Sequence, residues 1–512
     1  MIDPSPLPTR RQYVLLALIL VAAAFVRFYR IGTPSLWSDE LWSIEMAMGH
    51  GSVHDAFPDG VVRYDQPIPT SLASAAPWWQ IWTHVQVITH PPLYYIVLRW
   101  WMALFGSTPA ATRTLSVLLS LATIVIFFDV CRLLHGPRVA LLASGIFALS
   151  VGQIDIAQES RSYALLILEE IAACDVLVRI ILFGATKKRL VSLILLLSVM
   201  FLTHYLSIGV LSALAILAII QSRSRQRRQT VVAFIVAAVL VVAVWGYGFR
   251  NQLRTIPFSD PTYFHEIFPH HVANSFKAIV RLPLQYLVGE NLGLRAPFWI
   301  HIVIVVVILL LVMRAFRRRE LIFWSVLFIT VIAVVTAIDL TRDSTLLQYS
   351  RYTITAAPAL CAILATIEWP KKNHLIPVGF VASLAILAII QIFRPPAPRQ
   401  DFQQLAGVID STATPDELLV FYNQSDWLSP GIWYMGYKYY SPASNHPWLT
   451  LRHPPDAQLL HQLQTRNTLW LIGRSPEIFG PILFPGWRPT NVWHTTAGGI
   501  CLMRNTTPDS VR

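Results

Sequence analysis

The chain has 512 residues, of which 54% are hydrophobic and only 13% charged, and its mean hydropathy is +0.52. A water-soluble domain needs more polar surface than this composition supplies, so the sequence predicts a polytopic membrane protein. The 4 cysteines are scattered along the chain, mostly within apolar runs, which excludes a C-x-x-C metal site and a disulfide framework.

About eleven apolar runs have the length that crosses a bilayer, roughly 17 to 25 residues. The first follows Arg10 and Arg11 as a signal peptide would, but no small-residue cleavage site comes after it, so we interpret it as a retained span. A further run at 90–106 is shorter, opens with two prolines and carries Arg99. The eleven runs cover residues 12–30, 110–133, 138–156, 162–184, 189–204, 206–221, 230–249, 298–314, 321–339, 352–369 and 375–393.

The basic residues decide the orientation of these spans, because short cytoplasmic loops collect Lys and Arg. If residues 90–106 lie along the surface as an interfacial amphipathic helix, every strongly basic connection falls on one side. The net charge of +12 is then mostly a topology signal, which removes the reason to predict nucleic-acid binding. We therefore expect a cytoplasmic N-terminus in the cytoplasmic (inner) membrane and an extracytoplasmic C-terminus.

Two domains follow from this arrangement. Residues 1–394 form the transmembrane domain, and its first outer loop, 31–109, carries interfacial helices. A proline-rich linker starts at Arg394, and residues 395–512 form a small extracytoplasmic domain. Within it, the stretch 401–422 combines a helical pattern with an apolar run, which favours an α/β fold. The predicted fold class is an all-α polytopic membrane protein with a small C-terminal α/β domain.

The acidic pair Asp39 and Glu40 stands in the string SLWSDELWS, between Trp37 and Trp42. It follows the first span directly, and tryptophan is the type of side chain that sits at a membrane interface. Taken alone, two acids in a loop are more often solvated than catalytic. Their position on the outer face makes them candidates for a catalytic base.

Other polar residues are predicted to share that outer face, where charges are costly unless they line a water-filled cavity or pair with a partner. Arg161 and Arg351 stand at the outer starts of two spans, and two guanidinium groups on the same face as a carboxylate pair suggest a clamp for a phosphate. Each alone is also consistent with snorkelling to lipid headgroups. The further candidates for substrate binding are His90, Glu159, Tyr163, His204, Tyr205 and Tyr352, while the adjacent His270 and His271 are too poor a pattern to predict a metal site.

In these motifs the chain resembles the membrane glycosyltransferases of the GT-C type, and within them glycosyltransferase family 39, the group of the protein O-mannosyltransferases and the aminoarabinose transferases. The resemblance rests on LWSDELWS, HPPLYY, QESRSYALL and the THY and RYT turns, in the expected order over most of residues 13–370. It implies that Asp39 is the catalytic carboxylate, with Glu40 in support, that Glu159 is a second acidic residue, and that Arg351 lies near the donor phosphate. The 250–297 loop has no room for the large lumenal insertion of animal and fungal members, so the arrangement is more like that of bacterial members.

The resemblance implies transfer of a sugar from a polyprenyl-phosphate carrier to an acceptor hydroxyl of a lipid, glycan or protein. The residues suggest how. Asp39 would take the proton of the attacking hydroxyl, and Arg161 and Arg351 would stabilise the leaving phosphate without a metal, although a divalent metal stays open. One base and no carboxylate nucleophile predict inversion. Glu159 could instead hold Arg161 in place. The rival interpretations are a lipid-linked sugar transporter or flippase and a non-catalytic envelope protein.

Overall fold

The computed structural model describes residues 8–88, 90–255, 272–315, 319–342, 344, 346–367, 375–393, 399–423 and 429–506. It divides into two compact units, each made of discontinuous stretches of chain. The first contains residues 1–31, 86–94 and 112–396, and the second contains residues 32–85, 95–111 and 397–512. The sequence places the whole loop 31–109 in the membrane domain, whereas the structure groups most of that loop with the C-terminal residues. The predicted boundary at 394 and 395 lies outside the described residues.

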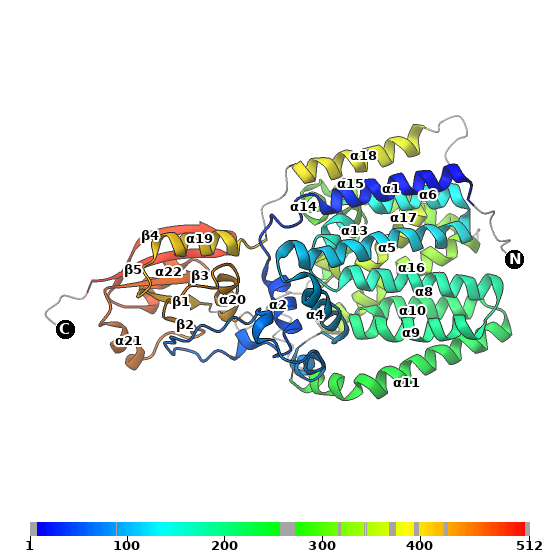
Figure 1. Cartoon of the computed structure of the whole chain (residues 1–512). Coiled ribbons are helices and arrows are strands. Elements are labelled where there is room, and N and C mark those ends of the chain that lie inside the picture. The colour runs from blue at the N-terminus through cyan, green and yellow to red at the C-terminus, as the bar shows by residue number, and fades with distance from the viewer. Residues whose placement is uncertain are drawn as a thin grey trace. The chain divides into compact units, whose positions relative to one another are not determined.

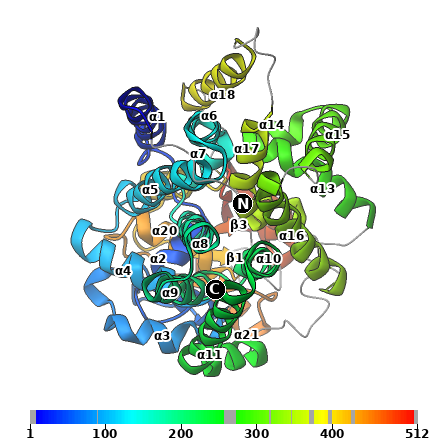
Figure 2. The same cartoon turned by 90° about the vertical axis from the view of Figure 1, so that its right-hand side faces the viewer.

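The first unit is a bundle of helices (Figures 1 and 2). Helix α8 is the most deeply embedded of its long helices and packs against α9 and α10. The elements are α1 (Arg10–Phe28), α5 (Pro109–His135), α6 (Pro137–Leu149), α7 (Val151–Ala157), α8 (Tyr163–Phe183), α9 (Lys187–Thr203), α10 (Ser207–Gln221), α11 (Ser224–Thr255), α13 (Val272–Val288), α14 (Glu290–Arg295), α15 (Phe298–Ala315), α16 (Arg319–Arg342), η6 (Leu346–Gln348), η7 (Ser350–Ala356), α17 (Ala357–Ala365) and α18 (Leu375–Phe393).

Apolar helices long enough to cross a membrane confirm the prediction of a multi-pass membrane protein. In the part of the chain that the structure describes there are 4 of them, α1, α5, α11 and α16, and a fifth if α6 and α7 form one bent span. The predicted number of eleven is not established. Helix α8 is 21 residues long but carries four charged side chains, and α9 and α10 have only 17 and 15 residues.

Helices α6 and α7 form a broken span. They are bent by 62° where they meet at Ser150, although the sequence predicts one continuous run over 138–156. The Ser150 hydroxyl donates to the carbonyl of Ile146, 2.6 Å away, and its extended backbone ends α6. A side chain that bonds the preceding turn is a known cause of a kink. The break leaves carbonyl groups at the end of α6 that need partners.

The second unit combines the first outer loop with the C-terminal residues. Its loop elements are α2 (Ser38–Ala47), η1 (Val53–Ala56), η2 (Leu72–Ser74), η3 (Trp78–Gln80), α3 (Ile81–His84) and most of α4 (Leu93–Phe105). Its C-terminal elements are α19 (Phe402–Thr412), β1 (Leu418–Tyr422), α20 (Gly431–Tyr440), β2 (Trp448–Leu451), α21 (Ala457–Leu463), β3 (Thr468–Gly473), α22 (Pro476–Leu483), β4 (Trp487–Thr495) and β5 (Gly498–Asn505). η4 (Val85–Val87) stands at the boundary of the two units.

The C-terminal strands form one 5-stranded sheet in the order β2-β1-β3-β5-β4 (Figure 1). Strands β1, β2 and β3 are parallel, and β5 is antiparallel to both β3 and β4. Strands β1 and β2 are buried along their whole length, as expected for parallel strands covered on both faces. The helix α19 followed by the strand β1 confirms the small α/β arrangement that the sequence predicts after residue 400.

Hydrogen bonds join the first outer loop to this sheet within the second unit. The backbone of Arg63 exchanges hydrogen bonds of 2.7 and 2.9 Å with the backbone of Trp448 in β2. The backbone N–H of Leu36 donates to the hydroxyl of Tyr440, 2.7 Å away, and the N–H of Ser38 donates to Oε1 of Gln400, 2.8 Å away. The C-terminal residues therefore fix the point at which the chain enters α2.

Helix α4 (Leu93–Phe105) lies within the run 90–106, for which the sequence predicts an interfacial helix. Its 13 residues span about 20 Å at 1.5 Å per residue, less than the roughly 30 Å of a bilayer core. In the second unit its outer side exposes Trp100, Leu104 and Phe105, and the ring of Trp100 lies 5.3 Å from that of Trp78. The helix is too short to span a bilayer, and its location at the interface stays a prediction.

Candidate functional site

The acidic pair lies in the first turn of α2, where carboxylates also favour the helix by interacting with its dipole. Glu40 is fully buried, and its Oε2 accepts a hydrogen bond from the backbone N–H of Trp37, 3.4 Å away. This is the return contact of a capping box, so Glu40 has a clear structural task at the start of the helix. Asp39 is half-buried, and its carbonyl accepts from the Ser43 hydroxyl at 2.9 Å. Of the two, Asp39 has the more accessible carboxylate.

Helix α2 carries a third acid, Glu45, which no sequence motif marks. It is fully buried against His54 of η1, and His54 in turn accepts a hydrogen bond at its carbonyl from the Ser429 hydroxyl, 3.1 Å away. A Cβ at Gly431 would stand 2.1 Å from that same carbonyl, so α20 can approach η1 only because this position is glycine. The pair thus connects α2 to η1 and α20. The hydrophobic pattern of the sequence does not mark Glu45, because most residues of α2 are buried, whether polar or apolar.

The remaining predicted residues belong to the first unit, and the structure gathers most of them at one place. The ring centroid of His204 lies 5.3 Å from that of His90 and 5.4 Å from that of Tyr163. The guanidinium of Arg161 lies 6.0 Å from the Tyr163 ring, and its charge acts on both histidines. The positive charge of Arg351 also lowers the pKa of His90. The residues come from four elements: the loop before α4, the turn before α8, the turn between α9 and α10, and η7.

His204 is held as a neutral hydrogen-bond donor. Its Nδ1 accepts from the backbone N–H of Leu206, 3.1 Å away, so in the neutral ring the proton is on Nε2. Burial lowers the pKa of His204 to about 3, and the charge of Arg161 acts in the same direction. Nε2 is buried and has no hydrogen-bond partner among the described residues. An unpaired buried N–H beside a guanidinium is suited to an anionic oxygen.

His90 is kept neutral by the same surroundings. Burial lowers the pKa of His90 well below its ordinary value, and Arg161, His204 and Arg351 add to the effect. Two neutral imidazoles beside two permanent cations make a site with positive charge and several N–H donors. Such a site favours a phosphate or another anion over a proton or a metal ion.

Arg351 lies against two neighbouring aromatic rings. Its guanidinium lies 4.9 Å from the ring of Tyr349 and 5.2 Å from the ring of Tyr352, distances at which a cation is attracted to a π face. The segment is fixed to the bundle by Thr353, whose hydroxyl accepts from Tyr286 of α13, 2.7 Å away. Tyr352, which the sequence nominates for substrate binding, is thus placed to orient Arg351.

Tyr205 has a supporting position that the sequence did not indicate. Its hydroxyl accepts from Nε1 of Trp245, 2.8 Å away, and donates to Oε1 of Gln252. Nε2 of Gln252 then donates to the carbonyl of His90, 2.9 Å away. The chain of contacts holds His90 in place from α11. Trp245 and Gln252 were missed because no motif marks them and they stand at the end of a long apolar helix.

Glu159 is half-buried in the turn that joins α7 to α8. Its backbone carbonyl accepts from the N–H of Arg161 at 2.9 Å, which closes the turn tightly around residues 159–161. The turn thereby fixes the backbone of Arg161 relative to α8.

No group of three His, Cys, Asp or Glu side chains within the described ranges is arranged to hold a metal ion. His270 and His271 lie outside those ranges.

The comparisons with known proteins agree with this fold. Residues 89–247 match the family described as dolichyl-phosphate-mannose-protein mannosyltransferase. ArnT from Cupriavidus metallidurans bound to undecaprenyl phosphate superimposes with a TM-score of 0.57 at 13% identity, over 97% of this chain and 98% of that one. The apo form of the same protein gives 0.57 and 13%, over 96% and 99%. No curated protein matches the chain in sequence.

These findings confirm the resemblance to membrane glycosyltransferases of the GT-C type, the class that includes ArnT and the protein mannosyltransferases. The family segment contains His90, Arg161, Tyr163 and His204, four of the five clustered residues of the first unit. The whole-chain superposition shows the ArnT fold, including its C-terminal part.

Proposed function

We propose that the protein is an inverting glycosyltransferase that moves a sugar from a polyprenyl-phosphate carrier to an acceptor hydroxyl. The observation that carries this proposal is the cluster of Arg161, Arg351, His90 and His204, which offers cationic and N–H groups to one anion. The similar ArnT structure contains undecaprenyl phosphate, a ligand with such an anionic headgroup. This chemistry supports a phosphate-linked donor, and the acceptor hydroxyl belongs to a lipid, a glycan or a protein.

In the proposed mechanism, Asp39 takes the proton from the acceptor hydroxyl as that oxygen attacks the anomeric carbon. The bond from the sugar to the carrier phosphate breaks, and the negative charge on the phosphate grows. Arg161, Arg351 and the Nε2–H of His204 stabilise that charge more in the transition state than in the bound donor, which lowers the barrier. One displacement without a carboxylate nucleophile inverts the anomeric centre. Glu40 supports Asp39 by fixing the first turn of α2.

The arginines supply the positive charge that a divalent cation supplies in other phosphate sites, so we propose that the reaction needs no cofactor. We place the reaction at the outer face of the cytoplasmic membrane, with about eleven spans, a cytoplasmic N-terminus and an extracytoplasmic C-terminal domain. The distribution of Lys and Arg among the connections supports this orientation.

The alternative proposal is a transporter or flippase for a lipid-linked sugar. Such proteins hold their substrate near the middle of the membrane, between repeated halves. The clustered residues here stand instead at helix ends, before α8 and between α9 and α10, which favours the transferase. A non-catalytic envelope protein would not need two neutral histidines beside two arginines.

The test is release of polyprenyl phosphate by the purified protein from polyprenyl-phosphate sugars in the presence of a membrane lipid extract, with and without EDTA. Asp39→Asn should abolish the release while leaving thermal unfolding unchanged. Normal turnover by Asp39→Asn would show that the base is another group. Transfer of intact donor between the leaflets of a vesicle, without release of phosphate, would support the flippase. Loss of activity in EDTA would reveal a metal requirement.

A further inference from the structure

Asp339 is a fully buried acidic residue in the last turn of α16, and the proposed mechanism does not use it. It ends the apolar run 321–339, where an acidic side chain is costly unless it has partners. Its partners follow the helix: Oδ1 accepts from the Ser344 hydroxyl and from the N–H of Leu346, both 2.8 Å away, and Oδ2 accepts from the N–H of Leu347, 3.1 Å away. The carbonyl of Asp339 accepts from the N–H of Ser344 as well, at 3.0 Å. These hydrogen bonds tie the chain that leaves α16 to one residue of the helix.

The same contacts lead to Arg351, which the proposed mechanism does use. The carbonyl of Leu346 accepts from the N–H of Tyr349, 3.0 Å away, and the carbonyl of Tyr349 accepts from the N–H of Tyr352, 3.1 Å away. The guanidinium of Arg351 lies against the rings of these two tyrosines, 4.9 and 5.2 Å from their centroids. An unbroken series of contacts therefore runs from Asp339 through Leu346 to both rings.

Position 339 needs a carboxylate, because each of its two oxygens accepts from a backbone N–H. Ser344 and Leu347 are fully buried, so solvent does not replace the carboxylate as their acceptor. An asparagine side chain has one acceptor oxygen, and its NH2 group would face the N–H of Leu346 or of Leu347. Asp339→Asn therefore keeps the size of the side chain and breaks at least one of the bonds to the start of η6.

We propose that Asp339 is a positioning residue for Arg351, which it holds through η6 and the two tyrosine rings in the orientation that binds the carrier phosphate. The inference rests on the proposed function, in which Arg351 stabilises the leaving phosphate. A guanidinium binds two phosphate oxygens at once only when its plane is correctly oriented. On the other flank of Arg351, the hydroxyl of Thr353 accepts from Tyr286, 2.7 Å away. The arginine is thus held from both directions along the chain.

The reactivity of Arg351 toward phenylglyoxal, followed by mass spectrometry of the purified full-length protein, measures whether the guanidinium is held. Asp339→Asn should raise the rate of labelling at Arg351 several-fold, because the rings would no longer keep a fixed place. Ser344→Ala removes one donor and leaves both backbone contacts, so it should cause a smaller rise, and it serves as the test if Asp339→Asn does not fold. An unchanged rate in every variant that folds would overturn the proposal.

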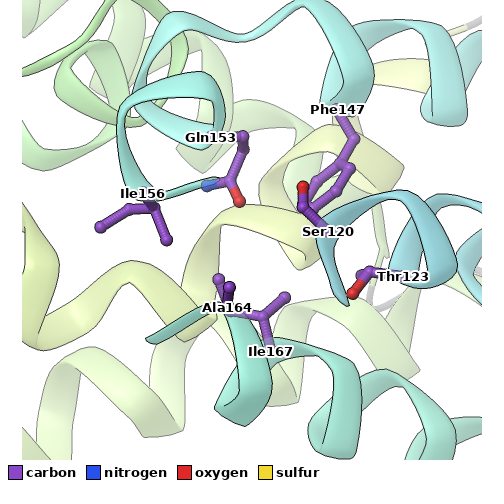
Figure 3. A pocket seen from close by; sticks show the side chains of 7 residues that line it. All are labelled: Ser120, Thr123, Phe147, Gln153, Ile156, Ala164 and Ile167. Carbon is purple, nitrogen blue, oxygen red and sulfur yellow. The ribbon is translucent and has the colours of Figure 1, made fainter. Parts of the chain in front are cut away.

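Two threonines provide matched controls for the labelling. Thr341 is exposed near the same end of α16, and its hydroxyl donates to the carbonyl of Ala337 in its own helix, 2.8 Å away. Thr123 is buried in α5, where Figure 3 shows it beside a small cavity, and its hydroxyl donates to the carbonyl of Leu119 in the same helix, 2.9 Å away. Thr341→Val and Thr123→Val should leave the labelling of Arg351 unchanged. Faster labelling in Thr123→Val would show that the effect reports general destabilisation, which would overturn the proposal.

Binding of a polyprenyl phosphate, measured by titration calorimetry in detergent solution, tests whether the positioning serves the phosphate. Asp339→Asn should weaken the affinity on the order of fivefold, within the usual range for coupled residues. The double variant with Arg351→Lys should bind no more weakly than Arg351→Lys alone, because Asp339 acts through Arg351. Additive losses, or an unchanged affinity in Asp339→Asn, would overturn the proposal.

The two measurements separate this inference from the proposed function. If the natural protein binds no polyprenyl phosphate, the proposed function fails, and the labelling of Arg351 still shows whether Asp339 holds it. If the natural protein binds the carrier phosphate and Asp339→Asn changes neither labelling nor affinity, the proposed function stands and the role of Asp339 is wrong.

Discussion

His54 and Glu45 form a buried pair in which Nδ1 of the histidine lies 2.6 Å from Oε2 of the glutamate. The backbone N–H of His54 donates to the other carboxylate oxygen, Oε1, at 2.9 Å, so both oxygens of Glu45 are hydrogen-bonded to His54. The pair connects η1 to the helix that bears Asp39. Removing one partner of such a buried pair leaves the other without compensation, a loss of about 3 to 5 kcal/mol.

The pair predicts that the second unit is less stable at alkaline pH. Burial by itself lowers the pKa of His54, and the charge of Arg452 acts in the same direction. The negative charges of Glu45 and Asp55 and the hydrogen bond that the His54 ring donates to Glu45 outweigh both, so the pKa of His54 is raised. The folded state therefore binds the proton more tightly than the unfolded chain. The stabilisation is complete below the ordinary histidine pKa of about 6.5 and is lost as the pH rises through the folded value.

Hydrogen exchange of the α2 amides, followed from pH 6 to pH 9, measures this effect. Protection should fall with rising pH beyond the intrinsic rate change, and His54→Gln should remove that fall. Asp59 and His453, 3.1 Å apart on the same unit but largely exposed, give a control pair whose His453→Gln change should leave the profile intact. A His54→Gln protein with the original pH dependence would contradict the assignment.

His204 is predicted to act as a neutral donor. Because the pKa of His204 is lowered to about 3, its titration should not appear in the pH dependence of turnover between pH 5 and 8. His204→Ala should reduce kcat on the order of 100-fold, the usual effect of removing one donor to a developing anion. His204→Gln, which can still offer an N–H, should retain more activity. An inflection of the rate profile that His204→Gln abolishes would show that the ring is charged during turnover.

Arg351 should be sensitive to replacement by lysine. Lysine keeps the charge but loses the planar group that lies against Tyr349 and Tyr352 and can bind two phosphate oxygens at once. We expect Arg351→Lys to weaken binding of a polyprenyl phosphate on the order of tenfold, measured by its inhibition of turnover. Arg342→Lys, at the end of α16, is a matched control that should bind normally. Equal affinity in both variants would show that Arg351 does not contact the phosphate.

The hydroxyl of Tyr205 predicts a positioning effect. Tyr205→Phe removes the contacts to Trp245 and Gln252 while keeping the ring that packs against Phe201 and Phe249. His90 should then lose its fixed position, and kcat should fall while the midpoint of thermal unfolding changes little. Gln252→Leu should have the same effect, and the double variant should lose no more than either single one. Additive losses would show that the two residues act separately.

The sequence predicts the helical membrane part well because long apolar runs leave few alternatives. The distribution of Lys and Arg along the sequence also predicts that Arg161, His204 and Arg351 lie on the same side of the membrane. In the structure all three lower the pKa of His90. The different roles of Asp39 and Glu40 could not be predicted from the sequence, because the capping contact of Glu40 depends on the backbone position of Trp37. The grouping of the first loop with the C-terminal sheet could not be predicted either, because it rests on hydrogen bonds between residues with no shared motif. The bend at Ser150 was hidden within an unbroken apolar run.

The contacts at the start of α2 also set an order of events during synthesis. Ser38 and Leu36 bond to residues that follow them by 362 and 404 positions. The segment that carries Asp39 leaves the ribosome before its anchors, Gln400 and Tyr440, have been made. Until then the acidic helix lacks its entry contacts, so a nascent or prematurely ended chain would not display the base in its final place. The acidic helix therefore gains these entry contacts only after Gln400 and Tyr440 have been made.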